Sequence, residues 1–90
     1  MSISIKIHTI FSQYTNDQSI VKVNGTTVGE CLDDLVKQFP DIEKELFDKK
    51  GRLFHYVSIW VNGEDAYPQE LAKSVKDGDE LHLLPLFAGG

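Results

Sequence analysis

The sequence is poor in cysteine and has no long apolar run. Cys31 is its single cysteine, so neither an internal disulfide framework nor a cysteine-rich metal site can form. We therefore expect a reducing compartment, the cytoplasm. No segment approaches the roughly 20 apolar residues that a membrane-spanning helix needs, and the first residues carry no export signal. The composition thus predicts a cytoplasmic protein without a membrane partner.

Basic residues are also scarce. The 9 Lys and Arg residues against 14 Asp and Glu residues give a formal net charge of −5. Such a chain repels phosphate backbones and has no basic stripe, so we do not expect a nucleic acid partner. What remains is a 90-residue chain with 41% hydrophobic and 26% charged residues, which is typical of one small folded domain.

The first half of the chain predicts two strands and a helix. Alternating isoleucines predict a strand over about residues 2–11, and the β-branched run at 20–23 predicts its hairpin partner. Apolar residues then recur at helical spacing over 28–38. Thr27 with Glu30 has the form of a capping box at the start of this helix. Residues 41–48 predict a further short helical turn.

The second half predicts the rest of a sheet. Residues 54–61 alternate as a strand, and residues 80–84 form the last strand after a turn at 77–79. A short extra strand is possible between the two. Pro85, which has no N–H, is expected to end the last strand. The order predicts an α+β fold: a mixed four- or five-stranded sheet with one main helix packed on one face.

Several turn motifs and the chain end carry a resemblance to a known family. In order they are Asn62-Gly63-Glu64-Asp65, Asp77-Gly78-Asp79, Leu84-Pro85 and Ala88-Gly89-Gly90. The chain resembles the small ubiquitin-like sulfur carriers, which include the molybdopterin synthase small subunit, the thiamine sulfur carrier and the carriers for cysteine or methionine synthesis. This resemblance implies a ubiquitin-like β-grasp domain over residues 1–87 and a flexible tail over 88–90.

The resemblance also implies a chemical role for the tail. In this family an enzyme of the ubiquitin-activating type adenylates the terminal glycine with ATP, and sulfur attack then gives a thiocarboxylate. Gly90 is therefore the expected reactive residue, and Ala88 and Gly89 form its arm. Because glycine has no Cβ, such an arm can enter a narrow channel. The expected partners are the adenylating enzyme and a sulfur-accepting synthase. A C-terminal processing protease is a third candidate, since the sequence leaves open whether Gly90 is exposed by cleavage.

A docking face for these partners follows from strand alternation. If Val57, Ile59, Val61, Leu81 and Leu83 face the helix, the residues between them face away. Large side chains in such a patch favour an interaction surface, whereas the alternative is that Tyr56 or Trp60 packs beneath the loop with Pro68. The predicted partner-binding residues are Tyr56, Trp60, His82, Leu84, Leu86 and Phe87.

Nothing in the sequence indicates an enzyme. It has no Ser-His-Asp order and no phosphate-binding glycine loop, so we expect a co-substrate of other enzymes that binds no cofactor or metal itself. Asp77, Asp79 and Glu80 are interpreted as a turn, not as a metal site. Cys31 shares the apolar side of the predicted helix and is expected to be an inert packed thiol.

Three functional hypotheses stay open at this stage. Molybdopterin-type carriers often have two consecutive prolines before the end, whereas this chain has Pro85-Leu86, so it looks more like the carriers for cysteine, methionine or related sulfur metabolism. The molybdopterin synthase small subunit is the alternative. The third, from another class, is a ubiquitin-like modifier that is conjugated to proteins through Gly90, or a pure binding module.

Overall fold

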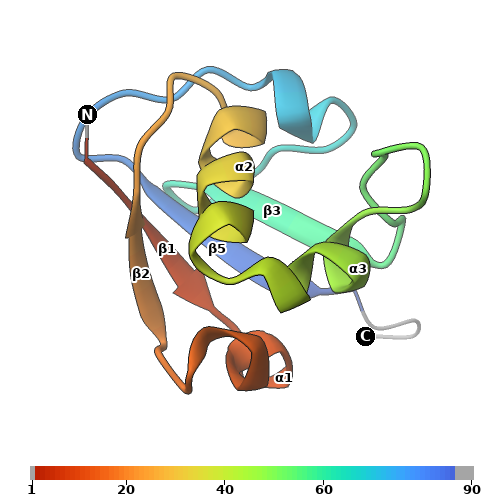
Figure 1. Ribbon diagram of the computed structural model, residues 1–90. Helices are drawn as coiled ribbons and strands as arrows, with labels where there is room; N and C mark the ends of the chain where they lie inside the picture. Colours follow the sequence, from red (N-terminus) through yellow and green to blue (C-terminus); the bar gives the residue numbers. More distant parts are fainter. Residues whose placement is uncertain (1, 87–90) are drawn as a thin grey trace.

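A five-stranded mixed sheet and one long helix packed across it form two layers (Figure 1). The computed structural model describes residues 2–86. The strands stand in the order β2-β1-β5-β3-β4, and only the central β1–β5 pair is parallel. The predicted α+β architecture is therefore confirmed. The strand bounds are β1 Ile3–Ile7, β2 Ile20–Val23, β3 Val57–Val61, β4 Glu64–Asp65 and β5 Glu80–Pro85.

The main helix α2 spans Val28–Gln38, as the apolar spacing predicts. Its first turn is capped by Thr27, whose side-chain oxygen accepts a hydrogen bond from the Glu30 N–H at 3.1 Å. The return half of the expected capping box is shifted by one residue, because Glu30 accepts from the Thr26 N–H at 2.7 Å and from the Thr26 hydroxyl at 2.8 Å. Two residues before the helix thus hold its first turn.

The core lies between α2 and the inner face of the sheet. The helix contributes four buried residues, and the strands contribute the inward members of each alternating run. Leu32 and Leu35 are fully buried in this layer. Within the part of the chain that the structure describes, no helix is long and apolar enough to span a bilayer.

The first strand is shorter than the sequence predicts. β1 ends at Ile7, and residues 8–11 enter a helical turn, α1 (Thr9–Ser12), followed by η1 (Gln13–Thr15). The prediction was wrong here because the alternation fails at Thr9, which is polar and exposed although the period of Ile3, Ile5 and Ile7 requires a buried residue there. Ile10, on the outward parity, is 47% exposed. The ring of His8 accepts a hydrogen bond from the Ile10 N–H at 3.1 Å, which caps the turn.

The strand predicted over 54–61 starts three residues late, at Val57. The Val57 N–H donates to the Phe54 carbonyl at 3.0 Å and so closes a turn before the strand. The helical turn predicted at 41–48 is confirmed as η2 (Pro40–Ile42) and α3 (Glu43–Leu46). A last short element, η3 (Glu70–Ala72), lies in the segment that joins β4 to β5.

Two of the turn motifs bind each other. Asn62 and Gly63 have positive φ angles of 50° and 86° and form the turn after β3. The Asn62 side chain donates to Asp79 at 3.0 Å and accepts from the Glu80 N–H at 2.9 Å. Asp79 also accepts from the Lys76 N–H at 2.9 Å. As predicted, this acidic segment is a turn, and its role is to join β3 to the start of β5.

We predict that the hydrogen bonds of Asp79 with Asn62 and Lys76 make the stability of the fold depend on pH. The Asn62 side chain and the Lys76 N–H bind the ionised form, so they hold the pKa of Asp79 below its usual range. Wild type should therefore unfold at a higher temperature than Asp79→Asn above about pH 4, which is near the unfolded-state pKa. This advantage should vanish as the pH falls through the lower folded-state pKa.

Thermal unfolding of both proteins between pH 2 and pH 7 checks this prediction. Asp33→Asn, on the exposed side of α2, is a matched control for the loss of one negative charge. A constant difference between wild type and Asp79→Asn across the whole range would contradict the assignment.

Candidate functional site

The residues before the predicted reactive tail belong to β5 (Glu80–Pro85), the middle strand of the sheet. β5 ends at Pro85, as predicted, and Pro85 is the register partner of Val57. One further backbone bond follows it, however, because the Leu86 N–H donates to the Tyr56 carbonyl at 2.6 Å. Pro85 therefore ends the strand without ending the hydrogen bonding between the two segments. The predicted reactive residues Ala88, Gly89 and Gly90, together with Phe87, lie outside the described residues.

Strand alternation near the arm follows the prediction. Five side chains face α2 and are buried, namely Val57, Ile59, Val61, Leu81 and Leu83. Trp60 and His82 are register partners on the opposite face, and Leu84 is paired with Ser58 beside them. The structure therefore brings Trp60, His82 and Leu84 together on the outer face of the sheet.

Tyr56 and Leu86 lie beyond the ends of these strands. They are joined by the backbone bond described above, and their side chains are 43% and 59% exposed. The Tyr56 ring stacks on Phe54, with 5.0 Å between ring centroids. With 43% exposure, Tyr56 is not buried beneath the loop with Pro68, whereas Trp60 is half-buried. Tyr56 and Leu86 extend the outer patch towards the arm.

The sequence did not indicate the polar half of this outer face. The parallel pairing of β1 with β5 places Lys6 beside His82. His82 lies 3.0 Å from a carboxylate oxygen of Glu80, and this hydrogen bond is the main cause that lowers the pKa of Glu80. The Trp60 indole N–H donates to the Ser58 hydroxyl at 2.9 Å. The patch thus offers one large aromatic ring bordered by charged groups, because the alternation of β1 also sends Lys6 outwards.

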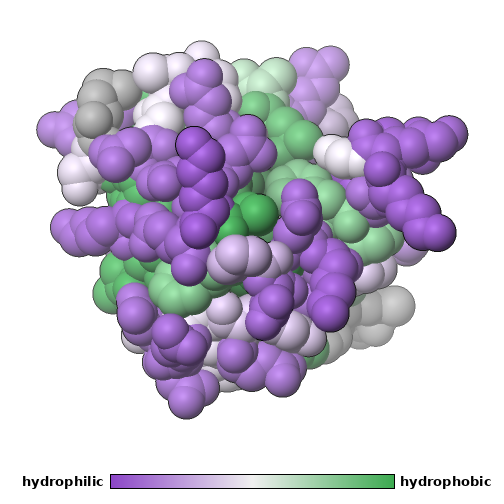
Figure 2. Space-filling view, in the orientation of Figure 1, coloured by the Kyte–Doolittle hydropathy of each residue, from purple (hydrophilic) through white to green (hydrophobic). Residues whose placement is uncertain are grey.

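The opposite side of the molecule has a different character. Figure 2 shows the helix side covered mainly by hydrophilic side chains, with apolar atoms visible only between them. Glu30, Asp33 and Lys37 of α2 are exposed on it. Of these two sides, the outer sheet face is therefore the better candidate for a partner that recognises apolar and aromatic groups.

Cys31 lies in the core, as predicted. Its side chain is 0% exposed, and burial raises the pKa of its thiol to about 11, with the nearby carboxylates of Glu30 and Asp34 adding to the effect. Since a thiolate is the reactive form of cysteine, this thiol is inert at neutral pH. Within residues 2–86 no group of three His, Cys, Asp or Glu side chains is placed to hold a metal ion.

If the chain accepts sulfur, as its resemblance to the sulfur carriers implies, we predict that Cys31→Ala accepts it as fast as wild type, because the thiol is buried and unreactive. The lost packing should lower the free energy of unfolding by about 1 kcal/mol. Intact mass after the sulfur-loading reaction and a denaturant titration check the two parts. As an independent test, iodoacetamide should leave the native wild-type protein unmodified and label it after unfolding. Loss of sulfur acceptance in a folded variant would contradict this prediction.

Comparisons with known proteins place this arrangement in a family. The model of the ThiS family matches residues 5–90. The sulfur carrier protein CysO of Mycobacterium tuberculosis is 36% identical over 93 aligned residues that cover 100% of both chains. Small archaeal modifier protein 1 of Haloferax volcanii is 39% identical over 71 residues, which are 78% of each chain.

Solved structures agree with the sequence matches. A chain in the crystal structure of the Amycolatopsis orientalis BexX/CysO complex has a TM-score of 0.87 and 34% identity, over 98% of this chain and 99% of that one. The crystal structure of SAMP1 from Haloferax volcanii has a TM-score of 0.86 and 31% identity, with 100% of both chains covered. The predicted ubiquitin-like β-grasp fold is thereby confirmed, and the chain belongs to the ThiS family of ubiquitin-like sulfur carriers.

Proposed function

We propose that this sulfur carrier works through its C-terminal Gly90. The carboxylate of Gly90 attacks the α-phosphate of ATP on an adenylating enzyme, which forms an acyl adenylate and releases pyrophosphate. The sulfur of a sulfide donor then attacks the acyl carbon, AMP leaves, and the terminus becomes a thiocarboxylate. The observation that carries this proposal is the family match, which runs through to residue 90 and so includes the terminal glycines. The chain supplies the acyl group, and the enzyme supplies the ATP site.

The outer sheet face supports a docking role in this reaction. β5 ends at Pro85, one residue after Leu84 and three after His82, the register partner of Trp60, so an enzyme that holds the C-terminal residues can also cover these side chains. Trp60 is half-buried at the centre of this patch, and a partly packed aromatic ring is a good anchor for a partner. We assign docking to these three residues together with Tyr56, Leu86 and Phe87.

The acceptor of the sulfur is assigned to a synthase of cysteine, methionine or related sulfur metabolism. The identity with CysO over the whole chain supports this choice, and so does the absence of the consecutive prolines often found in molybdopterin-type carriers. On this assignment the chain is a co-substrate that is consumed and regenerated, not a catalyst. The molybdopterin synthase small subunit remains the alternative within the family.

A second class of function is favoured by one specific observation. The match to small archaeal modifier protein 1 covers 78% of the chain at 39% identity. The same acyl adenylate could react with a lysine amine in place of sulfide, and the product would then be an isopeptide. Both reactions begin with the same activated Gly90, so they differ only in the nucleophile.

Intact mass spectrometry distinguishes these functions. The purified chain is incubated with ATP, sulfide and an adenylating enzyme found by ATP–pyrophosphate exchange with this chain. A mass gain that matches replacement of one oxygen by sulfur is expected, and omission of ATP should abolish it. An isopeptide-linked ladder on lysine-containing proteins, without the sulfur product, would favour the modifier. No change with any adenylating enzyme would overturn both.

A further inference from the structure

Two of the most exposed apolar side chains line one groove near the end of β5. Tyr67 is 74% exposed and Leu86 is 59% exposed, the two highest values among the large hydrophobic residues described. Both line the same groove, whose volume is about 560 Å³. Exposed apolar groups gathered in one hollow are costly in water unless something covers them. This groove adjoins the Trp60 patch on the outer face and shares Leu86 with it.

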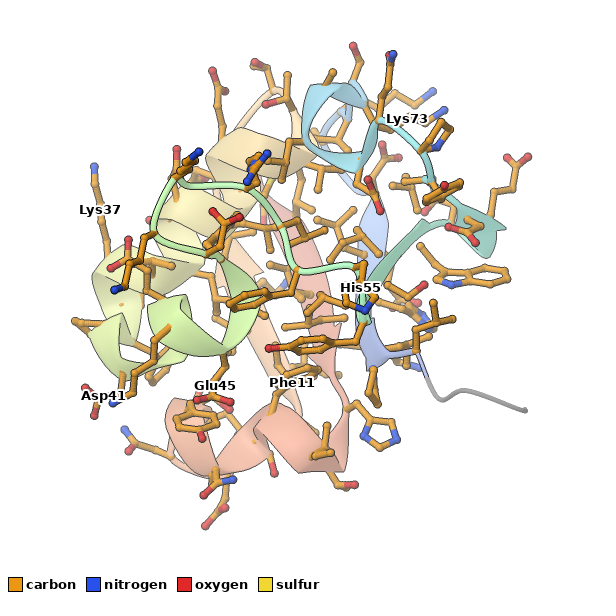
Figure 3. The ribbon with its side chains drawn as sticks, turned by 90° about the vertical axis from the view of Figure 1, so that its right-hand side faces the viewer. Phe11, Lys37, Asp41, Glu45, His55 and Lys73 are labelled. Atoms are coloured by element: carbon orange, nitrogen blue, oxygen red, sulfur yellow. The ribbon has the colours of Figure 1, made fainter. Side chains whose placement is uncertain are left out.

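The groove lies at the N-terminal end of β3, where Val57 and Ser58 line it. The segment 53–55 forms one wall, and Tyr67, Pro68 and Glu70 form the other. The Ala66 N–H donates to the Ile59 carbonyl at 2.9 Å and so ties the second wall to β3. The first wall is supported by the Phe54–Tyr56 stack. Figure 3 looks at this side, with His55 where the green segment reaches the sheet.

The polar groups of the groove have one dominant sign. Asp65, Glu70 and His55 line it, and no Lys or Arg is among its lining residues within the described part of the chain. One oxygen of Asp65 accepts a hydrogen bond from the Tyr67 N–H at 2.9 Å. Within residues 2–86, the recorded ion pairs are Asp48 with Arg52 and Glu80 with His82, so neither groove carboxylate is neutralised by a cation of the chain. An occupant that brings a cation would complement both.

We infer that the groove binds a protein segment in which an arginine adjoins a leucine-sized side chain. The guanidinium would pair with Asp65 and Glu70 and lie against the exposed Tyr67 ring, where a cation–π contact adds to the charge pairing. The apolar neighbour would cover Phe54 and Leu86. Because Leu86 lies only four residues before Gly90 in the sequence, the segment is assigned to the enzyme that adenylates the chain. That assignment rests on the proposed function, whereas the chemistry of the groove does not.

The first test needs no enzyme. The isotope-labelled chain is titrated with acetyl-Leu-Arg-Leu-amide and, as a matched control, acetyl-Leu-Glu-Leu-amide, while amide chemical shifts are recorded. The arginine peptide should move the signals of Phe54, Tyr67 and Glu70 and bind about five times more tightly or better, as expected for charge-assisted pairing. The double variant Asp65→Asn/Glu70→Gln should remove this preference. Equal binding of the two peptides, or shifts elsewhere on the surface, would overturn the inference.

The second test uses the adenylating enzyme identified by pyrophosphate exchange. The double variant should raise the KM for the chain about tenfold with little change in kcat, since the lost contacts precede the reaction. Asp33→Asn/Glu43→Gln removes the same charge from the helix side, and its KM should stay within about twofold of wild type. This control distinguishes contacts in the groove from the effect of the chain's net charge. Equal effects of the two double variants would overturn the assignment to the enzyme. Failure of the wild type to be adenylated would contradict the proposed function but leave the peptide result standing.

Two further experiments would detect other occupants of the groove. If the chain's own arm fills the groove, removal of residues 87–90 should strengthen binding of the arginine peptide by about tenfold or more. If a second copy fills it, sedimentation should show a concentration-dependent dimer that Tyr67→Ala dissociates. Either result would overturn the inference. Thermal unfolding of each variant checks that the substitution has left the protein folded.

Discussion

Deletion of Gly90 is expected to abolish sulfur acceptance completely while the free energy of unfolding stays within about 0.5 kcal/mol of wild type. The proposed reaction forms its adenylate on the Gly90 carboxylate, and no other group of the chain is offered as an acceptor. Stability should be unchanged because the buried core is built by residues between Ile3 and Leu83. Intact mass after the loading reaction and a denaturant titration measure the two quantities.

Two variants make this result specific. Gly90→Ala keeps the length and the carboxylate but adds a Cβ in a narrow channel, and a misplacement of about 1 Å at a reacting centre can cost about 100-fold in rate. A chain extended by one glycine after Gly90 keeps the tail composition but shifts the carboxylate, and it should also react more slowly. If the chain without Gly90 still gained one sulfur atom, the acceptor would be another group and the mechanism would be wrong.

The elements that sequence patterns predicted well are those with a long, regular period. The helix over 28–38 and the buried face of β3 and β5 were correct because each has several apolar residues at one spacing and a clear capping or turn residue at an end. The errors fall where the period is broken. The sequence predicts strand over residues 8–11 because Ile10 and Phe11 are apolar, but Thr9, at the inward position between Ile7 and Phe11, is exposed.

The candidate site was predictable in part for the same reason. Alternation along single strands placed Trp60, His82 and Leu84 on the outer face. Their polar neighbour Lys6 depends on the parallel pairing of β1 with β5, which joins segments more than 70 residues apart and has no local signal. The groove lined by Tyr67 depends on two irregular segments that meet only in the folded chain. Local patterns thus predict faces, whereas sites between segments need the tertiary structure.

Trp60→Ala should weaken binding of the adenylating enzyme by about 2 kcal/mol, roughly 30-fold, as expected for loss of an aromatic anchor. The ring lies on the outer face beside His82, away from the core, so its removal should leave the unfolding temperature nearly unchanged. Trp60→Phe keeps much of the apolar area but loses the indole N–H that donates to Ser58. Its affinity for the enzyme should therefore lie between those of wild type and Trp60→Ala. Titration calorimetry with the enzyme measures the affinities.

Ile10→Ala is a matched control, because Ile10 is 47% exposed but lies on α1, away from the sheet face. Its affinity should stay within about twofold of wild type, since isolated exposed apolar residues rarely contribute to a specific interface. Trp60 is the single tryptophan, so a chain labelled with 5-fluorotryptophan gives one fluorine signal from the middle of the face. That signal should shift on addition of the enzyme. An unshifted signal in the complex, or equal affinities of Trp60→Ala and Ile10→Ala, would place the enzyme on another surface.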